Sequence, residues 1–452
     1  MFTEILNYID GNIMWGPAMI IFLLGSHLYY TYKTGFMQKH IGKGIKLSLQ
    51  KDSSDKGDVS VFGSLMTALS STIGTGNIVG VGTAIVMGGP GAVFWTWIGG
   101  IFGIATKYAE SYIAVKHRRK HSNGVYTGGA MTAFEYLRKP ILAKVFAALC
   151  ALGAFGIGCS TQAAAIVDVM NGTFGVNKYL VGIILCILTT LVIFGGLNSI
   201  ANVCSKLVPV MSIVYIVGCV AILFINGKYL PETIMLILSS AFETKAAVGG
   251  FVGSTIIIAA RYGIARGLFS NEAGMGSAPQ ATAASVAKNA VKPALIGSTG
   301  VFWDTVVVCL MTGLVIVSSV VGNPNISAIG ISGATLCTTC FSQIPFGSEL
   351  LVFGILTFAY STILGWNYYG RNCCRYIFGH KSLPVYQTLW IVVIFVGTIL
   401  TEGVIWTIAD ILNAAMVLPN MLAVLWLRKE MVEDTKYYLD GDHLEEEDPN
   451  LI

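Results

Sequence analysis

Long apolar segments recur along the whole chain and are separated by short polar stretches. Most approach the roughly 20 residues that a helix needs to cross a bilayer, and together they leave no stretch for a separate soluble domain. The pattern therefore predicts an all-α polytopic membrane protein with one transmembrane domain over residues 1–430. We expect eleven spans, at Met14–Tyr32, Val61–Met87, Ala92–Val115, Ile141–Met170, Tyr179–Gly196, Val208–Ile225, Gly249–Met275, Leu295–Val321, Leu350–Gly370, Val385–Leu400 and Val404–Leu427.

The composition and the distribution of basic residues support this prediction. Hydrophobic residues make up 54% of the chain and charged residues 12%, and the formal net charge is only +4. With the N-terminus outside, 22 of the 28 Lys and Arg residues fall in cytoplasmic segments, whereas Lys178, Lys228 and Lys245 fall in external ones. This skew follows the positive-inside rule. We therefore expect a multi-pass protein of the cell membrane, surrounded by lipid, with a cytoplasmic C-terminus and no nucleic-acid partner.

The two ends of the chain carry different signals. No Lys or Arg precedes the first apolar run and no small-residue cleavage site follows it, so we expect it to remain as a span rather than to be a signal peptide. Residues 431–452 form an acidic cytoplasmic tail. From Asp440 onward the tail has too little apolar surface to fold alone, and we expect it to be solvated and disordered.

The second span contains a polar and glycine-rich interruption at Ser70–Asn77. A helix in lipid must satisfy its own backbone groups, so an unwound segment at this depth is tolerated where it lines a cavity. Opening the helix would expose the amides of Thr75, Gly76 and Asn77 to an anion, and the carbonyls near Ser70 and Ile73 to a hard cation. The glycines could accept unusual backbone angles and a close ligand. Alternatively, they serve only to let neighbouring helices pack closely.

The same pattern returns five spans later. Gly274 and Gly276, followed by Ser277, match Gly74 and Gly76 followed by Asn77. An odd number of intervening spans inverts the second unit relative to the first. The spacing therefore predicts two inverted five-helix repeats, over residues 61–226 and 249–427, whose first helices are both broken near the middle of the membrane.

Other polar residues inside spans are candidates for the same site. Gln162 lies on a face rich in small residues, and Ser361 and Thr362 offer adjacent hydroxyl oxygens of the kind that a small cation needs. The alternative for these hydroxyls is a hydrogen bond back to their own helix. The ionisable residues divide into two groups. We expect Lys107, Glu110, Asp168 and Asp410 to snorkel or pair near span ends, and Arg266, Glu272 and Asp304 to lie deeper, either as structural ion pairs or as a proton relay.

Three segments resemble the alanine or glycine:cation symporter family. These are Gly88–Trp97 (GGPGAVFWTW), Arg266–Pro279 (RGLFSNEAGMGSAP) and Ser71–Asn77 (STIGTGN). The resemblance extends along essentially the whole chain. It implies a leucine-transporter-type fold of ten core helices, the first and sixth of them broken, plus one extra N-terminal helix. It also implies sodium-driven uptake of alanine or glycine.

The resemblance further implies a role for particular residues. The amides of Thr75 and Gly76 would bind the substrate carboxylate. Sodium would be held by the carbonyls of Ser70 and Ile73 and by the hydroxyls of Ser361 and Thr362. The substrate pocket would be lined by Asn77, Gln162, Phe269, Ser270 and Asn271.

We therefore expect a secondary active transporter rather than an enzyme. It would bind sodium and a small zwitterion together, need no cofactor and function as a monomer. A proton-coupled carrier of the same fold, with Glu272 or Asp304 as the titrating group, is the nearest alternative. A channel or a membrane enzyme is a more distant one, because no filter motif is visible and the 6 histidines are dispersed.

Overall fold

The computed structural model describes residues 2–50, 57–121, 124–243, 250–251, 253–399 and 402–451. In these ranges the chain is almost entirely helical, with one short antiparallel hairpin of β1 (Arg119–Lys120) and β2 (Tyr126–Thr127). The α-helices are α1 (Phe2–Tyr8), α2 (Pro17–Lys33), α3 (Ile41–Ser48), α4 (Val61–Thr72), α5 (Val79–Gly88), α6 (Gly91–Lys116), α7 (Ala130–Tyr136), α8 (Pro140–Phe155), α9 (Thr161–Phe174), α10 (Lys178–Ile193), α11 (Gly196–Ile225), α12 (Leu230–Phe242), α13 (Ile256–Asn271), α14 (Pro279–Ala283), α15 (Val291–Val301), α16 (Leu310–Gly322), α17 (Gly333–Phe341), α18 (Gly347–Phe378), α19 (Leu383–Gly397), α20 (Glu402–Trp426) and α21 (Arg428–Asp434).

Shorter 3₁₀ or π segments extend or join these helices. They are η1 (Ile9–Met14), η2 (Met37–His40), η3 (Thr75–Asn77), η4 (Gly156–Ser160), η5 (Gly227–Tyr229), η6 (Phe302–Cys309), η7 (His380–Ser382) and η8 (Thr435–Asp440). Through η4 the helices α8 and α9 form one long helix, and through η6 the helices α15 and α16 form another. Both are long and apolar enough to cross a bilayer.

Each expected span coincides with a helix or a series of helices. The agreement is loosest at α11, which begins at Gly196 rather than Val208, and at α18, which continues to Phe378. The expected boundaries at Gly249 and Leu400, and the external Lys245, lie outside the described residues. Further helices lie between the expected spans, namely α3, α7, α12, α14 and α17, and α17 packs against α5.

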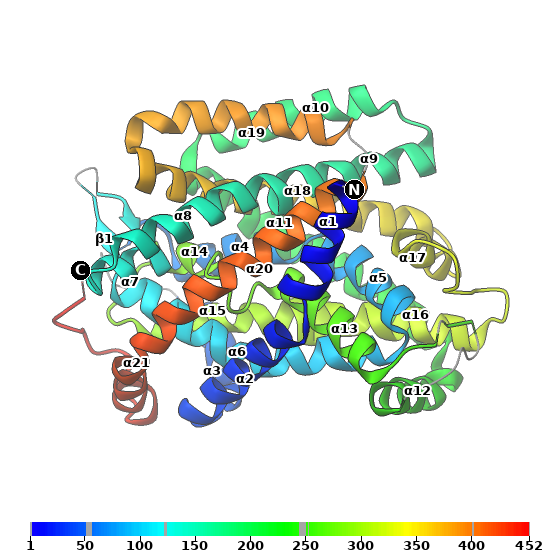
Figure 1. Ribbon diagram of the computed structural model, residues 1–452, viewed down its shortest axis with the longest axis horizontal. Coiled ribbons are helices and arrows are strands. Elements are labelled where there is room, and N and C mark those ends of the chain that lie inside the picture. The colour runs from blue at the N-terminus through cyan, green and yellow to red at the C-terminus, as the bar shows by residue number, and fades with distance from the viewer. Residues whose placement is uncertain are drawn as a thin grey trace.

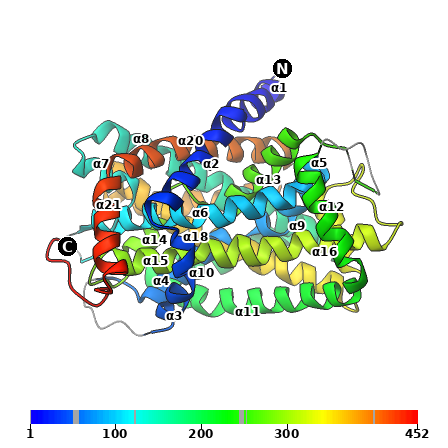
Figure 2. The ribbon, with the colours of Figure 1, turned by 90° about the horizontal axis from the view of Figure 1, so that it is seen from below.

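The long helices run along the long axis of the molecule (Figure 1). The helices α10 and α19 lie side by side at one face, and α18 runs through the middle in contact with α4, α8, α9 and α11. On the other side α13 packs against α5 and α6. The segments α3, α7 and α21 lie at one end of the bundle, here called the tail end, and α12 and α17 lie at the opposite end (Figure 1). Figure 2 shows α1 projecting from the side of the bundle.

Both predicted helix breaks are present. In the first, α4 ends at Thr72, residues 73 and 74 are not helical, and a 3₁₀ turn leads into α5. In the second, α13 ends at Asn271 and α14 begins at Pro279, where the fixed φ of proline suits a helix start. The two breaks contact one another, since the site of a Gly76 Cβ atom lies 3.4 Å from Ser270 Cα.

The acidic tail does not conform to expectation. We predicted a disordered segment from Asp440 onward, and this was wrong, because Leu444, Asp448 and Leu451 are buried against the tail end of the bundle. The segment has little apolar surface of its own, but it is held by Lys116 of α6, by Lys292 of α15 and by Asn289, which precedes α15.

Candidate functional site

The first break withdraws two backbone donors from the end of α4. The amide of Gly74, which would pair with the Ser70 carbonyl in an unbroken helix, donates to Asn77 Oδ1 at 2.8 Å. The amide of Asn77, which would pair with the Ile73 carbonyl, donates to Gly74 O at 3.2 Å. The carbonyls of Ser70 and Ile73 therefore lose their usual helical partners. Carbonyl oxygens at a helix C-terminus are suitable ligands for a hard cation.

Hydroxyl groups of α18 lie next to these carbonyls. Ser361 Oγ is 3.5 Å from Ile73 O, and a Cβ atom on Gly74 would meet Thr362 Oγ1 at 2.5 Å. Both hydroxyls donate back to Phe358 O, at 2.9 and 3.0 Å, as the alternative interpretation anticipated. A hydroxyl that donates its proton in this way still has lone pairs on its oxygen. The arrangement therefore brings the hydroxyls of Ser361 and Thr362 beside the end of α4, where Ser70 and Ile73 are also buried.

The glycines of the first break are needed for space rather than for backbone angles. Gly74 has φ −133°, and Gly76 is not among the glycines with positive φ. A Cβ atom on Gly76 would lie 3.1 Å from Phe269 Cδ1, closer than ordinary van der Waals contact. The expectation of unusual backbone angles at these two glycines was therefore wrong, and close approach explains both positions. Positive φ occurs instead in the second break, at Gly274 and Gly276.

The amide end of the first break faces Gln162. Its Oε1 accepts the amide of Thr75 over a long 3.4 Å, while its Nε2 donates to Ile157 O at 2.9 Å. The hydroxyl Oγ1 of Thr75 is buried, and within the described part of the chain it has no hydrogen-bond partner. This corner thus presents one weakly held amide and one unsatisfied hydroxyl, which are groups that a ligand carboxylate could bind.

Asp304 on η6 joins the two breaks and is absent from the predicted set of binding residues. Its carboxylate accepts from Asn77 Nδ2 at 2.6 Å, from Ser270 Oγ at 2.9 Å and from Thr305 Oγ1 at 2.6 Å. The side chain is fully buried, and no ion pair reaches it within the described residues. The structural ion pair considered for Asp304 is therefore not seen. A buried carboxyl group held by neutral donors therefore lies beside the two breaks, where an ionisable group is a candidate for function.

The last turn of α13 forms the opposite wall. Phe269 packs against Trp406 of α20 with ring centroids 5.5 Å apart, and Asn271 Nδ2 donates to Thr305 Oγ1 at 3.0 Å. Phe269, Ser270 and Asn271 are all buried. Trp406, like Asp304, is absent from the predicted binding residues, because nothing local in the sequence indicates which aromatic residue of α20 faces α13.

The second break is filled by the protein itself. Glu110 Oε2 of α6 accepts the amides of Gly274 and Gly276, at 3.2 and 3.0 Å, and the side-chain amide of Asn420 at 2.8 Å. Lys107 lies 3.0 Å from the other oxygen of Glu110 and donates to Glu272 O at 2.9 Å.

Lys107 and Glu110 were expected to snorkel or pair near a span end, and snorkelling is wrong. Their side chains are 4% and 1% exposed and fix the second break from within. Asp410 does pair, with Arg266 at 2.7 Å. One carboxylate oxygen of Glu272 accepts a hydrogen bond from Ser277 Oγ.

The comparisons with known proteins agree with this architecture. The crystal structure of MhsT in complex with L-phenylalanine superposes with a TM-score of 0.57 at 16% sequence identity, covering 84% of this chain and 92% of that one. The fold, with its paired broken helices, is therefore of the leucine-transporter type.

The family follows from the sequence relatives. The model of the sodium:alanine symporter family matches residues 1–451, and the chain belongs to that family. The sodium/alanine symporter AgcS of Methanococcus maripaludis is 40% identical over 447 residues, 97% of either chain. The probable sodium/glutamine symporter GlnT of Bacillus subtilis is 33% identical over 443 residues, 96% of this chain and 91% of that one. Sodium-coupled amino-acid symport is the activity that these relatives support.

Proposed function

We propose that this protein imports alanine, and glycine as a second substrate, together with sodium by alternating access. Sodium is held by the carbonyls of Ser70 and Ile73 and the hydroxyls of Ser361 and Thr362. The substrate carboxylate binds the amides of Thr75 and Gly76. The N-terminus faces outside, the C-terminus lies in the cytoplasm of a cell whose plasma membrane contains the protein, and a monomer suffices.

The difference between the two breaks carries the proposal. Both expose backbone amides, but those of Gly274 and Gly276 are occupied by Glu110, whereas the Thr75 amide has a hydrogen bond of 3.4 Å to Gln162. The first break therefore has the capacity for an external carboxylate. It lies beside the only cluster of carbonyls and hydroxyls that we assign to a cation, so the two ligands can stabilise one another. Linkage then requires that each raise the affinity for the other by the same factor.

The carboxyl group of Asp304 supports a position for the other end of the substrate. A zwitterion whose carboxylate lies at Thr75 has an ammonium group within a few bonds, and the carboxylate of Asp304 beside Asn77 and Ser270 is the acceptor for a cation at this place. A second sodium ion could take the same position. Asp304→Asn removes the charge and retains the size, so it should abolish binding of alanine if the ammonium group lies there. If Asp304 instead holds a second sodium ion, the variant should bind alanine weakly and show a lower apparent number of coupled sodium ions.

Uptake in liposomes tests the proposal. Purified protein should accumulate labelled alanine when sodium is high outside, and should not do so with a proton gradient alone. Accumulation driven equally well by protons would favour the proton-coupled alternative. Competition by glycine, valine, leucine and glutamine measures the specificity, and glutamine is included because GlnT is named for it.

A further inference from the structure

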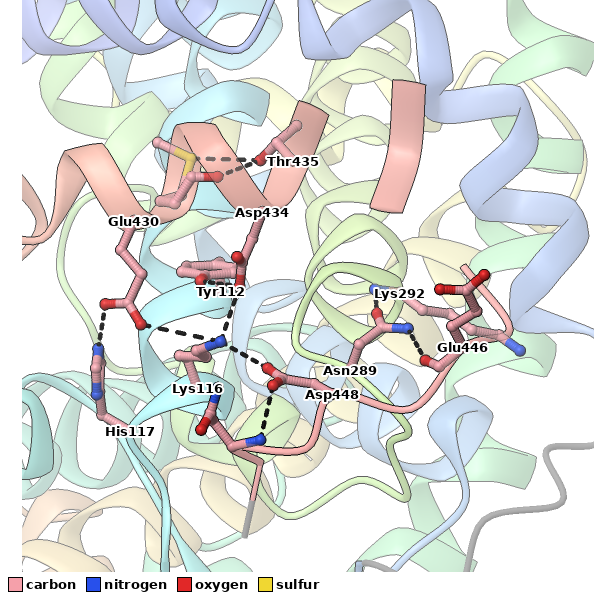
Figure 3. A network of polar contacts seen from close by, with 12 residues as sticks. Tyr112, Lys116, His117, Asn289, Lys292, Glu430, Asp434, Thr435, Glu446 and Asp448 are labelled. Carbon is pink, nitrogen blue, oxygen red and sulfur yellow. Dashed lines mark hydrogen bonds and ion pairs between the residues drawn. The ribbon is translucent and has the colours of Figure 1, made fainter. Parts of the chain in front are cut away.

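The acidic tail binds a basic surface at the tail end of the bundle (Figure 3). Asp448, whose side chain is 3% exposed, lies 2.6 Å from Lys116 Nζ at the end of α6. Lys116 also lies 2.9 Å from Asp434 and 3.9 Å from Glu430 of α21. Ion pairs thus hold the segment that follows α20 against α6.

The tail also holds the segment that leads into α15. Asn289 Nδ2 donates to the carbonyls of Leu444 and Glu446, at 2.9 and 3.0 Å. The amide of Asp448 donates to Lys288 O at 2.9 Å, and Lys292 Nζ lies 2.7 Å from Glu445. The hydrogen bond from Lys292 lowers the pKa of Glu445 below its ordinary value, so this carboxylate stays charged at any cytoplasmic pH.

Residues 288–292 are in turn linked by hydrogen bonds of the preceding residues to the ends of both broken helices. The chain after α14 pairs with the chain before α4, because Asp58 N donates to Ala284 O at 2.7 Å and Val286 N donates to Val59 O at 2.9 Å. Arg118, two residues after Lys116, donates to Ser285 O at 2.8 Å. The ends of α4 and α14 nearest the tail are therefore tied to each other and, through residues 284–292, to the tail.

A groove lies beside this connection. It has a volume of about 520 Å³ and is lined by the start of α4 and the start of α11, including Ser60, Gly63, Ala201 and Asn202. Widening it requires α4 to move away from α11. Because α4 is tied to residues 284–286, the tail restrains that movement.

We propose that residues 441–451 act as a latch that restrains opening of the candidate site toward the tail end. The proposal rests on the alternating access proposed above. The latch combines charge pairs and backbone hydrogen bonds with two buried apolar side chains, Leu444 and Leu451, and salt weakens its ionic part. Glu445, for instance, has a side chain that is 64% exposed, and exposed ion pairs weaken as salt screens them.

Thiol labelling measures the opening without requiring transport. Ala201 lies at the floor of the groove and is buried, so Ala201→Cys should react slowly with a membrane-impermeant thiol reagent. Adding Asp448→Asn, or deleting residues 441–452, should speed this reaction severalfold. Glu447→Gln makes the same charge change at an exposed residue of the tail and should leave the labelling rate unchanged. Raising potassium chloride should speed labelling in the intact chain and not in the truncated one.

Controls separate release of the latch from loss of structure. The same tail variants without Ala201→Cys report on the ten native cysteines, all of them buried or half-buried, and their reactivity should not change. If the truncated protein does not remain folded by size-exclusion chromatography, Asp448→Asn and Asn289→Ala decide. Unchanged labelling of Ala201→Cys in these folded variants overturns the latch. Failure of sodium-driven uptake would refute the proposed function but leaves the labelling result readable.

Discussion

Gly76 offers the sharpest test of the candidate site. The site of a Cβ atom there lies 3.1 Å from Phe269 Cδ1 and 3.4 Å from Ser270 Cα, so Gly76→Ala forces the two breaks apart by a few tenths of an ångström. Overpacking of this kind costs about 1–3 kcal/mol in a well-packed interior. If the strained contact is part of the substrate pocket, alanine affinity should fall by the same free energy, which is about 5-fold to 150-fold.

The assay is equilibrium binding of labelled alanine at saturating sodium, together with thermal unfolding in detergent. Gly76 does not have positive φ, so the added methyl group causes no backbone strain, and the lower entropy of the unfolded chain offsets part of the overpacking cost. The unfolding temperature should therefore fall only modestly. Gly25→Ala, on α2 with open space around it, is the matched control. It should bind alanine normally.

A second substitution distinguishes a local steric contact with Phe269 from a general disturbance of the structure. Phe269→Leu removes the ring edge that the new methyl group would meet, so Gly76→Ala/Phe269→Leu should bind alanine better than the two separate losses predict. Near-normal affinity of Gly76→Ala would show that the substrate does not lie between the breaks. Strict additivity of the two losses would refute the steric reasoning.

Three further outcomes follow from the same geometry. Ser361→Ala and Thr362→Val should each shift the sodium activation curve of uptake to higher concentration, whereas Thr357→Val, a hydroxyl on the same helix that bonds only within it in the described structure, should not. Phe269→Ala should let leucine and glutamine compete better against alanine, and an unchanged order of competition would remove Phe269 from the pocket wall. Lys107→Gln leaves the buried carboxylate of Glu110 unpaired, at a cost of about 3–5 kcal/mol, so it should lower thermal stability more than Lys107→Gln/Glu110→Gln does; equal losses would contradict this.

The first break could be predicted because its signal is local. Glycines and hydroxyl residues inside an apolar run conflict with the requirement that a helix in lipid satisfy its own backbone, and the structure resolves that conflict at Ile73 and Gly74 as the sequence suggests. The fold class followed from the repetition of that signal at Gly274 and Gly276. The helices α12 and α17 escaped notice, since both are shorter than a bilayer span.

The partners of buried charges could not be predicted, because they are brought together from distant parts of the chain. Glu110 accepts amides more than 160 residues away, and Asp304 meets Asn77 across 227 residues. The prediction of a disordered tail was wrong for the same reason. Composition rightly indicates that residues after Asp440 cannot fold alone, but it contains no information about Lys116 and Asn289, on which they rest.

Glu110 makes the two helix breaks of the molecule different from one another. It acts as a permanent internal ligand of the second break, which is complete before any solute arrives. The Thr75 amide of the first break, with its long hydrogen bond to Gln162, has no comparable internal ligand. Two units with the same pattern of glycines thus differ: a side chain of the protein closes the second break, whereas under the proposed function the substrate completes the first.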